Sequence, residues 1–258
     1  MNEPLTSVRN PLIMKLRALK EKRGRLEHGL FVVEGQKLMM EALDCGLEPR
    51  VVLISEPGDV DLAAFERAGA QIYPVSDSVI EAVCDTKTPQ GCCAAFAMPQ
   101  QPSLNMLPNR LVALDGVQDP GNVGAIWRTA DAAGFEAMVL GKNCADPYAP
   151  KVQRSAMGSG FRVPVIHVED LAETLRECKA GGYDIIVSEL SGTSFYDHAP
   201  LSDKFLLVIG SEARGATEQV MNQATMRLKL PMRGGAESLN AAVAAGIMMY
   251  ELTRELCE

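Results

Sequence analysis

The chain has 258 residues, of which 47% are hydrophobic and 22% charged, and its formal net charge is −8. This length and composition predict one large or two modest globular domains with a full apolar core. No apolar run reaches the roughly 18 residues needed to cross a bilayer. Because the first residues also lack the apolar core of a signal peptide, we expect a cytoplasmic protein with no membrane partner.

The cysteines and histidines are scattered along the chain. Seven cysteines and three histidines are present, and no two cysteines have the C-x-x-C spacing of a zinc site. We therefore expect no metal, and cysteines that are buried, reduced thiols.

The net negative charge argues against a nucleic-acid partner, but one segment is strongly basic. Between Arg9 and Arg25 lie seven basic residues and a single acid, Glu21. Because screening limits the reach of charge to about 10 Å, such a local stripe can hold phosphates despite the overall charge. Charge alone leaves open that the stripe is only a solvated helix face.

Helical and strand-like segments alternate over the first hundred residues. A helical pattern opens at Asn10 and Pro11 and runs through Lys22, with leucines three and four residues apart. Ser76 is expected to cap a later helix. The apolar, strand-like segments are 30–33, 51–54, 71–75 and 92–98, and the expected helices are 11–22, 37–45, 60–68 and 76–84.

The segment 98–110 contains three prolines and no periodic pattern, which is typical of a linker. We place a boundary near residue 105, which gives domains of residues 1–104 and 105–258. Beyond it, apolar segments without alternation predict a parallel sheet that is buried on both faces. Its expected strands are 110–115, 137–141, 163–168, 184–190, 204–210 and 227–231, and a last helix is expected from Ser238 to about Leu256.

Three glycine-rich motifs follow strands of this sheet. The first, LDGVQDPGNVGAIWRTADAAGF over 114–135, turns from a strand into a helix that carries Asn122 and Arg128. The second, LLVIGSEARGAT over 206–217, has Gly210 at the strand end, followed by Glu212. Alone, each is compatible with a structural turn, since glycine-rich strand-to-helix turns are common.

The third motif, LKLPMRGGAESLNAAVAAGIMMYEL over 228–252, predicts an irregular loop and then a long helix. Ser238 or Glu237 is expected to cap that helix, with Asn240 in its first turn. All three motifs follow strands of one sheet, and loops at the carboxyl ends of parallel strands converge. The residues therefore predict one ligand cleft with a guanidinium and several polar groups.

Together the three motifs resemble the SpoU (TrmH) branch of the SPOUT RNA methyltransferases. The resemblance rests on DPGNVGAIWRTADAAGF, IGSEARGAT and LPMRGGAESLNAAVAAGI, with DPYAPKVQRSAMGSGFRVPV at 146–165 between the first two, and covers about residues 108–256. Residues 7–43 resemble the family's ribosomal-protein-like RNA-binding extension. The resemblance implies an α/β protein with a small RNA-binding domain, a parallel-sheet methyltransferase domain with a deep trefoil knot, and a homodimer.

The resemblance also implies roles for individual residues, with S-adenosyl-L-methionine (SAM) as cofactor. The expected catalytic residues are Asn122, Arg128, Glu212, Ser238 and Asn240. The expected cofactor contacts are Gly210, Leu230 and Leu239. The expected RNA contacts are Lys15, Lys20, Lys22, Arg23 and Arg25. Where the family usually has S-L-N-V-S-V, this chain has SLNAAV. Ala241 and Ala242 thus replace the usual valine and serine, and the hydroxyl of that second serine is missing.

The expected reaction is methyl transfer to a ribose 2′-hydroxyl of structured RNA. Arginine is effectively always protonated, so we expect Arg128 to grip a phosphate and stabilise the developing alkoxide rather than to act as a base. The two-domain layout favours ribosomal over transfer RNA. A transfer-RNA methyltransferase and a non-catalytic assembly factor on the same scaffold are the alternatives. A third alternative is a metabolic enzyme with a nucleotide cofactor, but the chain lacks the dinucleotide-binding fingerprint of such enzymes. The sequence identifies neither the target nucleotide nor its base.

Overall fold

The computed structural model describes residues 4–55 and 58–254. Contacts divide the chain into two compact units, one formed by residues 1–100 with 148–161 and one by residues 101–147 with 162–258. The sequence assigns residues 148–161 to the second domain, whereas they pack with the first unit. As a division into independently folding domains, the expected limit between residues 104 and 105 stays a prediction.

The first unit is a four-stranded mixed sheet with helices on both faces. Its strands lie in the order β1-β4-β2-β3, with β4 antiparallel to β1 and β2, and β2 parallel to β3. The strands are β1 (Leu30–Glu34), β2 (Pro49–Ile54), β3 (Gln71–Pro74) and β4 (Cys92–Ala97), and the helices are α1 (Pro11–Ala18), α2 (Lys22–His28), α3 (Gln36–Asp44), α4 (Leu62–Arg67) and α5 (Asp77–Val83). These strands confirm the expected small α/β unit.

Alternation along β4 explains the two layers of helices around this sheet. Cys93 and Ala95 face a cluster with α1 and α5, whereas Ala94 and Phe96 face a cluster with α3 and α4. Because successive strand residues point to opposite faces, an unbroken apolar strand needs cover on both sides. Ser76 precedes α5 as expected, but its hydroxyl contacts that of Ser78 and caps no backbone N–H.

The single helix expected over 11–22 is wrong, because the chain breaks after Ala18 and restarts at Lys22. Contacts between residues five and six positions apart stabilise the break. A Cβ at Gly24 would lie 2.1 Å from the carbonyl oxygen of Ala18, so only glycine allows α2 to pass this close to α1. The guanidinium of Arg25 donates to the carbonyl oxygens of Leu19 and Lys20, both at 2.7 Å. It thereby satisfies carbonyls that a continuing helix would have bonded.

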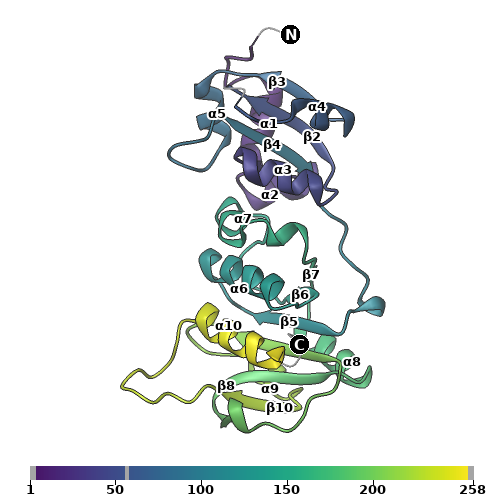
Figure 1. The fold of residues 1–258 in the computed structure, drawn as a ribbon, viewed down its shortest axis with the longest axis vertical. Coiled ribbons are helices and arrows are strands. Elements are labelled where there is room, and N and C mark those ends of the chain that lie inside the picture. Colours follow the sequence, from purple (N-terminus) through teal and green to yellow (C-terminus); the bar gives the residue numbers. More distant parts are fainter. Residues whose placement is uncertain (1–3, 56–57, 255–258) are drawn as a thin grey trace. The chain divides into compact units, whose positions relative to one another are not determined.

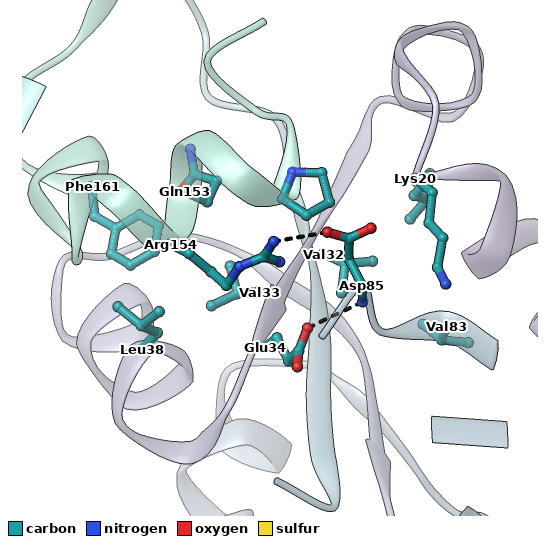
Figure 2. Close-up of a pocket in the computed structure, with 12 residues that line it drawn as sticks. Lys20, Val32, Val33, Glu34, Leu38, Val83, Asp85, Gln153, Arg154 and Phe161 are labelled. Carbon is teal, nitrogen blue, oxygen red and sulfur yellow. Dashed lines mark hydrogen bonds and ion pairs between the residues drawn. The ribbon is translucent and has the colours of Figure 1, made fainter. Parts of the chain in front are cut away.

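Residues 148–161 complete the first unit with α7 (Pro150–Ala156) and a 3₁₀ turn, η2 (Ser159–Phe161). The ring of Tyr148 packs on Phe31 with centroids 5.2 Å apart. The guanidinium of Arg154 pairs with Asp85 at 2.8 Å, and Glu34 accepts a hydrogen bond from the Asp85 backbone N–H at 3.2 Å (Figure 2). An apolar contact and an ionic contact therefore tie this segment to the sheet.

The second unit is built on a six-stranded sheet in the order β10-β8-β9-β5-β6-β7, and every neighbouring pair is parallel. This confirms the parallel α/β sheet expected of a SPOUT domain. The strands are β5 (Arg110–Asp115), β6 (Ala137–Leu140), β7 (Val165–His167), β8 (Asp184–Ser194), β9 (Phe205–Gly210) and β10 (Met226–Lys229).

Helices cover the sheet of the second unit. They are α6 (Pro120–Ala132), α8 (Leu171–Ala180), α9 (Glu218–Met221) and α10 (Ala241–Leu252), with 3₁₀ turns η1 (Leu104–Met106) and η3 (Phe195–Asp197). Leu175 of α8 joins the buried cluster that contains Leu206 and Val208 of β9. Helices α6 and α10 pack side by side (Figure 1), and α10 also contacts β9.

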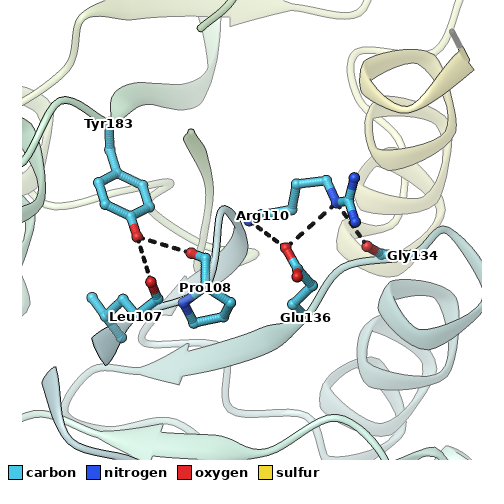
Figure 3. A network of polar contacts seen from close by, with 6 residues as sticks. All are labelled: Leu107, Pro108, Arg110, Gly134, Glu136 and Tyr183. Carbon is cyan, nitrogen blue, oxygen red and sulfur yellow. Dashed lines mark hydrogen bonds and ion pairs between the residues drawn. The ribbon is translucent and has the colours of Figure 1, made fainter. Parts of the chain in front are cut away.

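The expected linker is anchored at its end. The hydroxyl of Tyr183 donates to the carbonyl oxygens of Leu107 and Pro108 at 2.9 Å each (Figure 3). Next to them, Arg110 donates its backbone N–H to Glu136 at 3.0 Å and its Nε to the Gly134 carbonyl at 3.0 Å. The chain therefore enters β5 from a fixed position, which in turn fixes the first motif at the other end of that strand.

Candidate active site

The first two motifs meet at the carboxyl edge of the parallel sheet. Asp115 and Gly210 are the last residues of β5 and β9 and are direct partners across the two strands. Gly116 has a φ of +72°, which favours glycine, and turns the chain out of β5. Asp119 then caps α6 by accepting the backbone N–H of Asn122 at 2.9 Å. Asn122 is thereby held in the first turn of a helix that begins at this edge.

A chain of hydrogen bonds joins all three motifs. Asn240 accepts the N–H groups of Ala242 and Val243 at 2.9 and 3.3 Å, which orients its side-chain amide. Its Nδ2 therefore points outward and donates to Oδ1 of Asn122 at 3.0 Å. The Nδ2 of Asn122 donates in turn to Oε1 of Glu212 at 2.5 Å. The helix cap at one end and the carboxylate at the other fix the direction of both amides, and the expected convergence of the motifs is confirmed.

The third motif differs from expectation at the start of its helix. Helix α10 begins at Ala241 with Asn240 as its cap, not Ser238 or Glu237. Asparagine is as good a cap as serine, and here its amide also reaches the next motif. Ser238 lies two residues earlier on an exposed, irregular loop. The helix ends at Leu252, and the expected end near Leu256 lies outside the described residues.

Arg128 is exposed on α6, six residues after Asn122. Among the described residues it has no hydrogen-bond or ion-pair partner, whereas Arg110 pairs with Glu136 and Arg162 with Asp131. An unpaired, exposed guanidinium is free to contact a phosphate or an oxyanion.

The three expected cofactor contacts lie at or beyond strand ends. Gly210 ends β9, and a Cβ there would lie 2.0 Å from the backbone nitrogen of Ala216. Leu230 directly follows β10 and is buried, whereas Leu239 is 38% exposed beside Ser238. Residues 230–240 form neither helix nor strand. Their backbone groups are therefore not used in a regular ladder.

Sequence reasoning gave no role to Asp115 and Lys142 at this edge. The carboxylate of Asp115 accepts the backbone N–H of Thr217 at 2.6 Å. An open cleft next to Glu212 is lined by Asp115, Lys142 and Arg214, among others. A charged residue directly after an apolar strand was the available signal for Asp115. No sequence pattern indicated Lys142.

The basic stripe divides into exposed and buried members. Lys15, Lys22 and Arg23 are exposed and Lys20 is half-buried. Arg25 is only 3% exposed, and its guanidinium bonds the end of α1. The expected RNA contact by Arg25 stays a prediction, and its buried guanidinium favours a structural role instead.

Within residues 4–55 and 58–254, no cluster of three or more histidine, cysteine, aspartate or glutamate side chains could hold a metal ion. In the same residues no helix is long and apolar enough to span a membrane.

Comparison with known proteins identifies the family. Residues 109–250 match the SpoU rRNA Methylase family. The chain belongs to this family. Residues 10–94 match the MRM3-like substrate binding domain, so the SpoU region is preceded by a second recognised module.

Related SpoU-type proteins cover nearly the whole chain. The Bacillus subtilis 23S rRNA (guanosine(2553)-2′-O)-methyltransferase RlmP is 35% identical over 96% of this chain and 98% of its own length. An AdoMet-bound rRNA methyltransferase from Sinorhizobium meliloti has a TM-score of 0.90 at 32% identity, covering 98% of both chains. The SpoU methyltransferase AviRb from Streptomyces viridochromogenes, in complex with AdoMet, has a TM-score of 0.86 at 26% identity, covering 97% of this chain and 99% of its own.

Proposed function

We propose that this protein transfers a methyl group from SAM to the 2′-hydroxyl of a ribose in ribosomal RNA. The observation that carries the proposal is the hydrogen-bonded chain from Asn240 through Asn122 to Glu212, with the exposed Arg128 on the same helix as Asn122. Membership of the SpoU family and the similarity to RlmP support the reaction and the substrate class. The match to a substrate-binding domain supports an RNA partner for the first unit.

The residues at the carboxyl edge fit SAM as the methyl donor. When bound, SAM supplies an electrophilic methyl group on a positively charged sulfur. Irregular backbone at the carboxyl edge of a parallel sheet offers N–H and C=O groups to a nucleoside, and residues 230–240 are irregular there. We assign this role to the backbone of Gly210, Leu230 and Leu239, because the side chain of Leu230 is already buried.

Arg128 acts on the RNA in this proposal. A ribose hydroxyl must lose its proton in or near the transition state, and the resulting negative charge is stabilised by a nearby cation. The guanidinium of Arg128 cannot accept that proton, since arginine is effectively always protonated. It therefore grips the adjacent phosphate and stabilises the developing alkoxide, while the proton leaves through Ser238 or water. Asn122 holds Glu212 and Asn240 together through its side-chain amide.

The exposed cations of the first unit supply affinity for RNA phosphates. Lys15, Lys20, Lys22 and Arg23 are the residues assigned to this contact, because all four are at least partly exposed. Such contacts release counterions and make binding strongly dependent on salt. Because ribosomal RNA is the substrate, the protein works in the cytoplasm.

A homodimer completes the proposal. Helix α10 is apolar all round, which is typical of a helix that is covered on every side. Ala245, Met248 and Met249 are buried, yet Val243, Ile247 and Tyr250 are 52%, 39% and 52% exposed. A second copy of the chain would cover this second face. The trefoil knot implied by the family resemblance is also part of the proposal.

The decisive experiment maps 2′-O-methylated riboses in total RNA from cells with and without the gene. One methyl group should disappear from 23S ribosomal RNA, and the purified protein with SAM should restore it on RNA from the deletion strain. The guanosine named for RlmP is the first position to inspect. Loss at a transfer-RNA position would give the alternative substrate. Intact methylation with defective ribosome assembly would identify a non-catalytic assembly factor.

A further inference from the structure

The loop that carries Glu212 is closed on itself. Ser211 and Gly215 exchange backbone hydrogen bonds of 3.0 and 2.8 Å, and the Ser211 hydroxyl also donates to the Gly215 carbonyl at 3.2 Å. Gly210 packs so tightly against the backbone of Gly215 and Ala216 that no side chain would fit. Hydrogen bonds between Ser211 and Gly215 therefore make the 211–217 loop small and rigid, and Glu212 lies inside this closed part, directly after Ser211.

A hydrogen bond ties the end of this loop to β5. The last residue of the loop, Thr217, donates its backbone N–H to Asp115 at 2.6 Å across 102 positions of sequence. Asp115 is itself fixed, since it ends β5 and pairs with Gly210 where the loop begins. Strand pairing thus holds the start of the loop, and a charged hydrogen bond to Asp115 ties its end to the same strand pair.

We propose that Asp115 is a positioning residue for methyl transfer, which acts by holding the 211–217 loop so that Glu212 meets Asn122. The inference rests on the proposed function of this site. Without the Asp115 carboxylate the end of the loop loses its tie to β5 and opens more often, and the contact between Asn122 and Glu212 at 2.5 Å is then broken more often. A hydrogen bond to a charged group contributes enough free energy for its loss to open the loop about tenfold more often.

Two substitutions separate the hydrogen bond from the charge. Asp115→Ala removes the acceptor, whereas Asp115→Asn keeps an oxygen that can accept the Thr217 N–H. Asp61→Ala is the matched control, because Asp61 accepts the backbone N–H of Ala64 at 3.0 Å in the first unit. It loses a bond of the same kind far along the chain from the loop.

Limited trypsin digestion reports the loop directly, because Arg214 is exposed at its tip. Cleavage after Arg214 is measured by mass spectrometry relative to cleavage after Arg233, which is exposed on the neighbouring irregular loop. We expect Asp115→Ala to raise this ratio about tenfold and to lower kcat while leaving KM for RNA unchanged. Asp115→Asn should restore the ratio and part of kcat, and Asp61→Ala should leave the ratio at the wild-type value.

Two results would overturn the inference. One is an unchanged Arg214 ratio in Asp115→Ala, and the other is an equal rise in Asp115→Ala and Asp61→Ala, which would reflect general destabilisation. If the wild-type protein methylates no RNA, the proposed function fails. The ratio of cleavage after Arg214 to cleavage after Arg233 would still test whether Asp115 holds the loop.

Discussion

Arg128 differs from its neighbouring arginines because nothing within the described residues neutralises it. Arg128→Ala should abolish methyl transfer and leave the affinity for SAM largely unchanged, since the lost contact is to RNA rather than to the cofactor. Arg128→Lys keeps the charge but loses the two-pronged grip on a phosphate. Single-turnover rates and calorimetric SAM titration measure the two effects. Wild-type turnover in Arg128→Ala would refute the assignment.

Arg25 is expected to behave oppositely, as a structural residue. Arg25→Ala leaves the carbonyl oxygens of Leu19 and Lys20 without a partner in a buried site, so it should lower the free energy of unfolding by about 2–3 kcal/mol. Urea denaturation measures the loss.

The matched comparison for Arg25 is Arg23→Ala, because Arg23 is exposed two residues away. It should leave the urea midpoint unchanged and make the salt dependence of RNA binding shallower by about one unit of slope. If Arg25→Ala instead made the salt dependence of RNA binding shallower and left the stability unchanged, Arg25 would be an RNA-binding residue.

Two buried thiols make the stability of the folded protein fall at alkaline pH. Burial raises the pKa of Cys92 and of Cys178 to about 11 from the ordinary 9.0. The unfolded chain therefore loses protons above pH 9.0 that the folded chain still keeps. The stabilisation is fully present below pH 9.0 and is lost as the pH rises toward 11. Thermal unfolding of the wild type and of a Cys92→Ala, Cys178→Ala double variant between pH 7 and 11 should show a flatter decline in the variant. If the unfolding temperature fell equally steeply with pH in both proteins, the two thiols would not be the cause of the decline.

The sequence predicted which motifs meet better than it predicted the local structure of their residues. Motif order predicted that Asn122, Glu212 and Asn240 meet, because the carboxyl ends of parallel strands share an edge, and hydrogen bonds join the three. It did not tell which polar residue caps α10, since Ser238 and Asn240 are equally good caps. Packing decided for Asn240, whose amide also reaches Asn122.

Among the elements, α10 leads to the clearest prediction. Its exposed stripe of Val243, Ile247 and Tyr250 should form the contact between two copies of the chain. Val243→Glu with Ile247→Glu places charge on that face and should convert a dimer to a monomer, because a buried charge without a partner is costly. Light scattering after size exclusion measures the mass. Met106→Glu is the control, since Met106 is 83% exposed on η1, and a dimer that survives the double variant would move the interface elsewhere.

Most strands were predictable as elements because their apolar runs are short and bounded by turn residues. The helix break after Ala18 was not, because local propensity favours one continuous helix over 11–22. The cause lies in two contacts across the break, the close approach at Gly24 and the bonds of Arg25. Such contacts across a helix break do not alter the hydrophobic periodicity from which helices are predicted.

At the scale of the whole molecule, a segment from the middle of the chain stabilises the first unit. Tyr148→Ala should increase hydrogen exchange in β1, more than a hundred residues earlier, because Phe31 loses one aromatic contact and keeps the one with Phe96. The expected loss is about 3 kcal/mol, as for other buried aromatic side chains cut to alanine. Tyr196→Ala is the control, since Tyr196 is 54% exposed. Faster exchange confined to the second unit would contradict the prediction.

The order of strands in the parallel sheet also governs how quickly the chain can fold. Strand β8 pairs only with β9 and β10, both later in the chain, and β9 must enter between β8 and β5. As the chain leaves the ribosome, the sheet can therefore grow in chain order from β5 through β6 to β7, whereas β8 must wait for β9. Pairings between distant residues slow folding, since the loops that they close cost entropy before any contact is gained. Until β9 arrives, both edges of β8 stay open, and it is during this interval that a nascent chain most needs protection from aggregation.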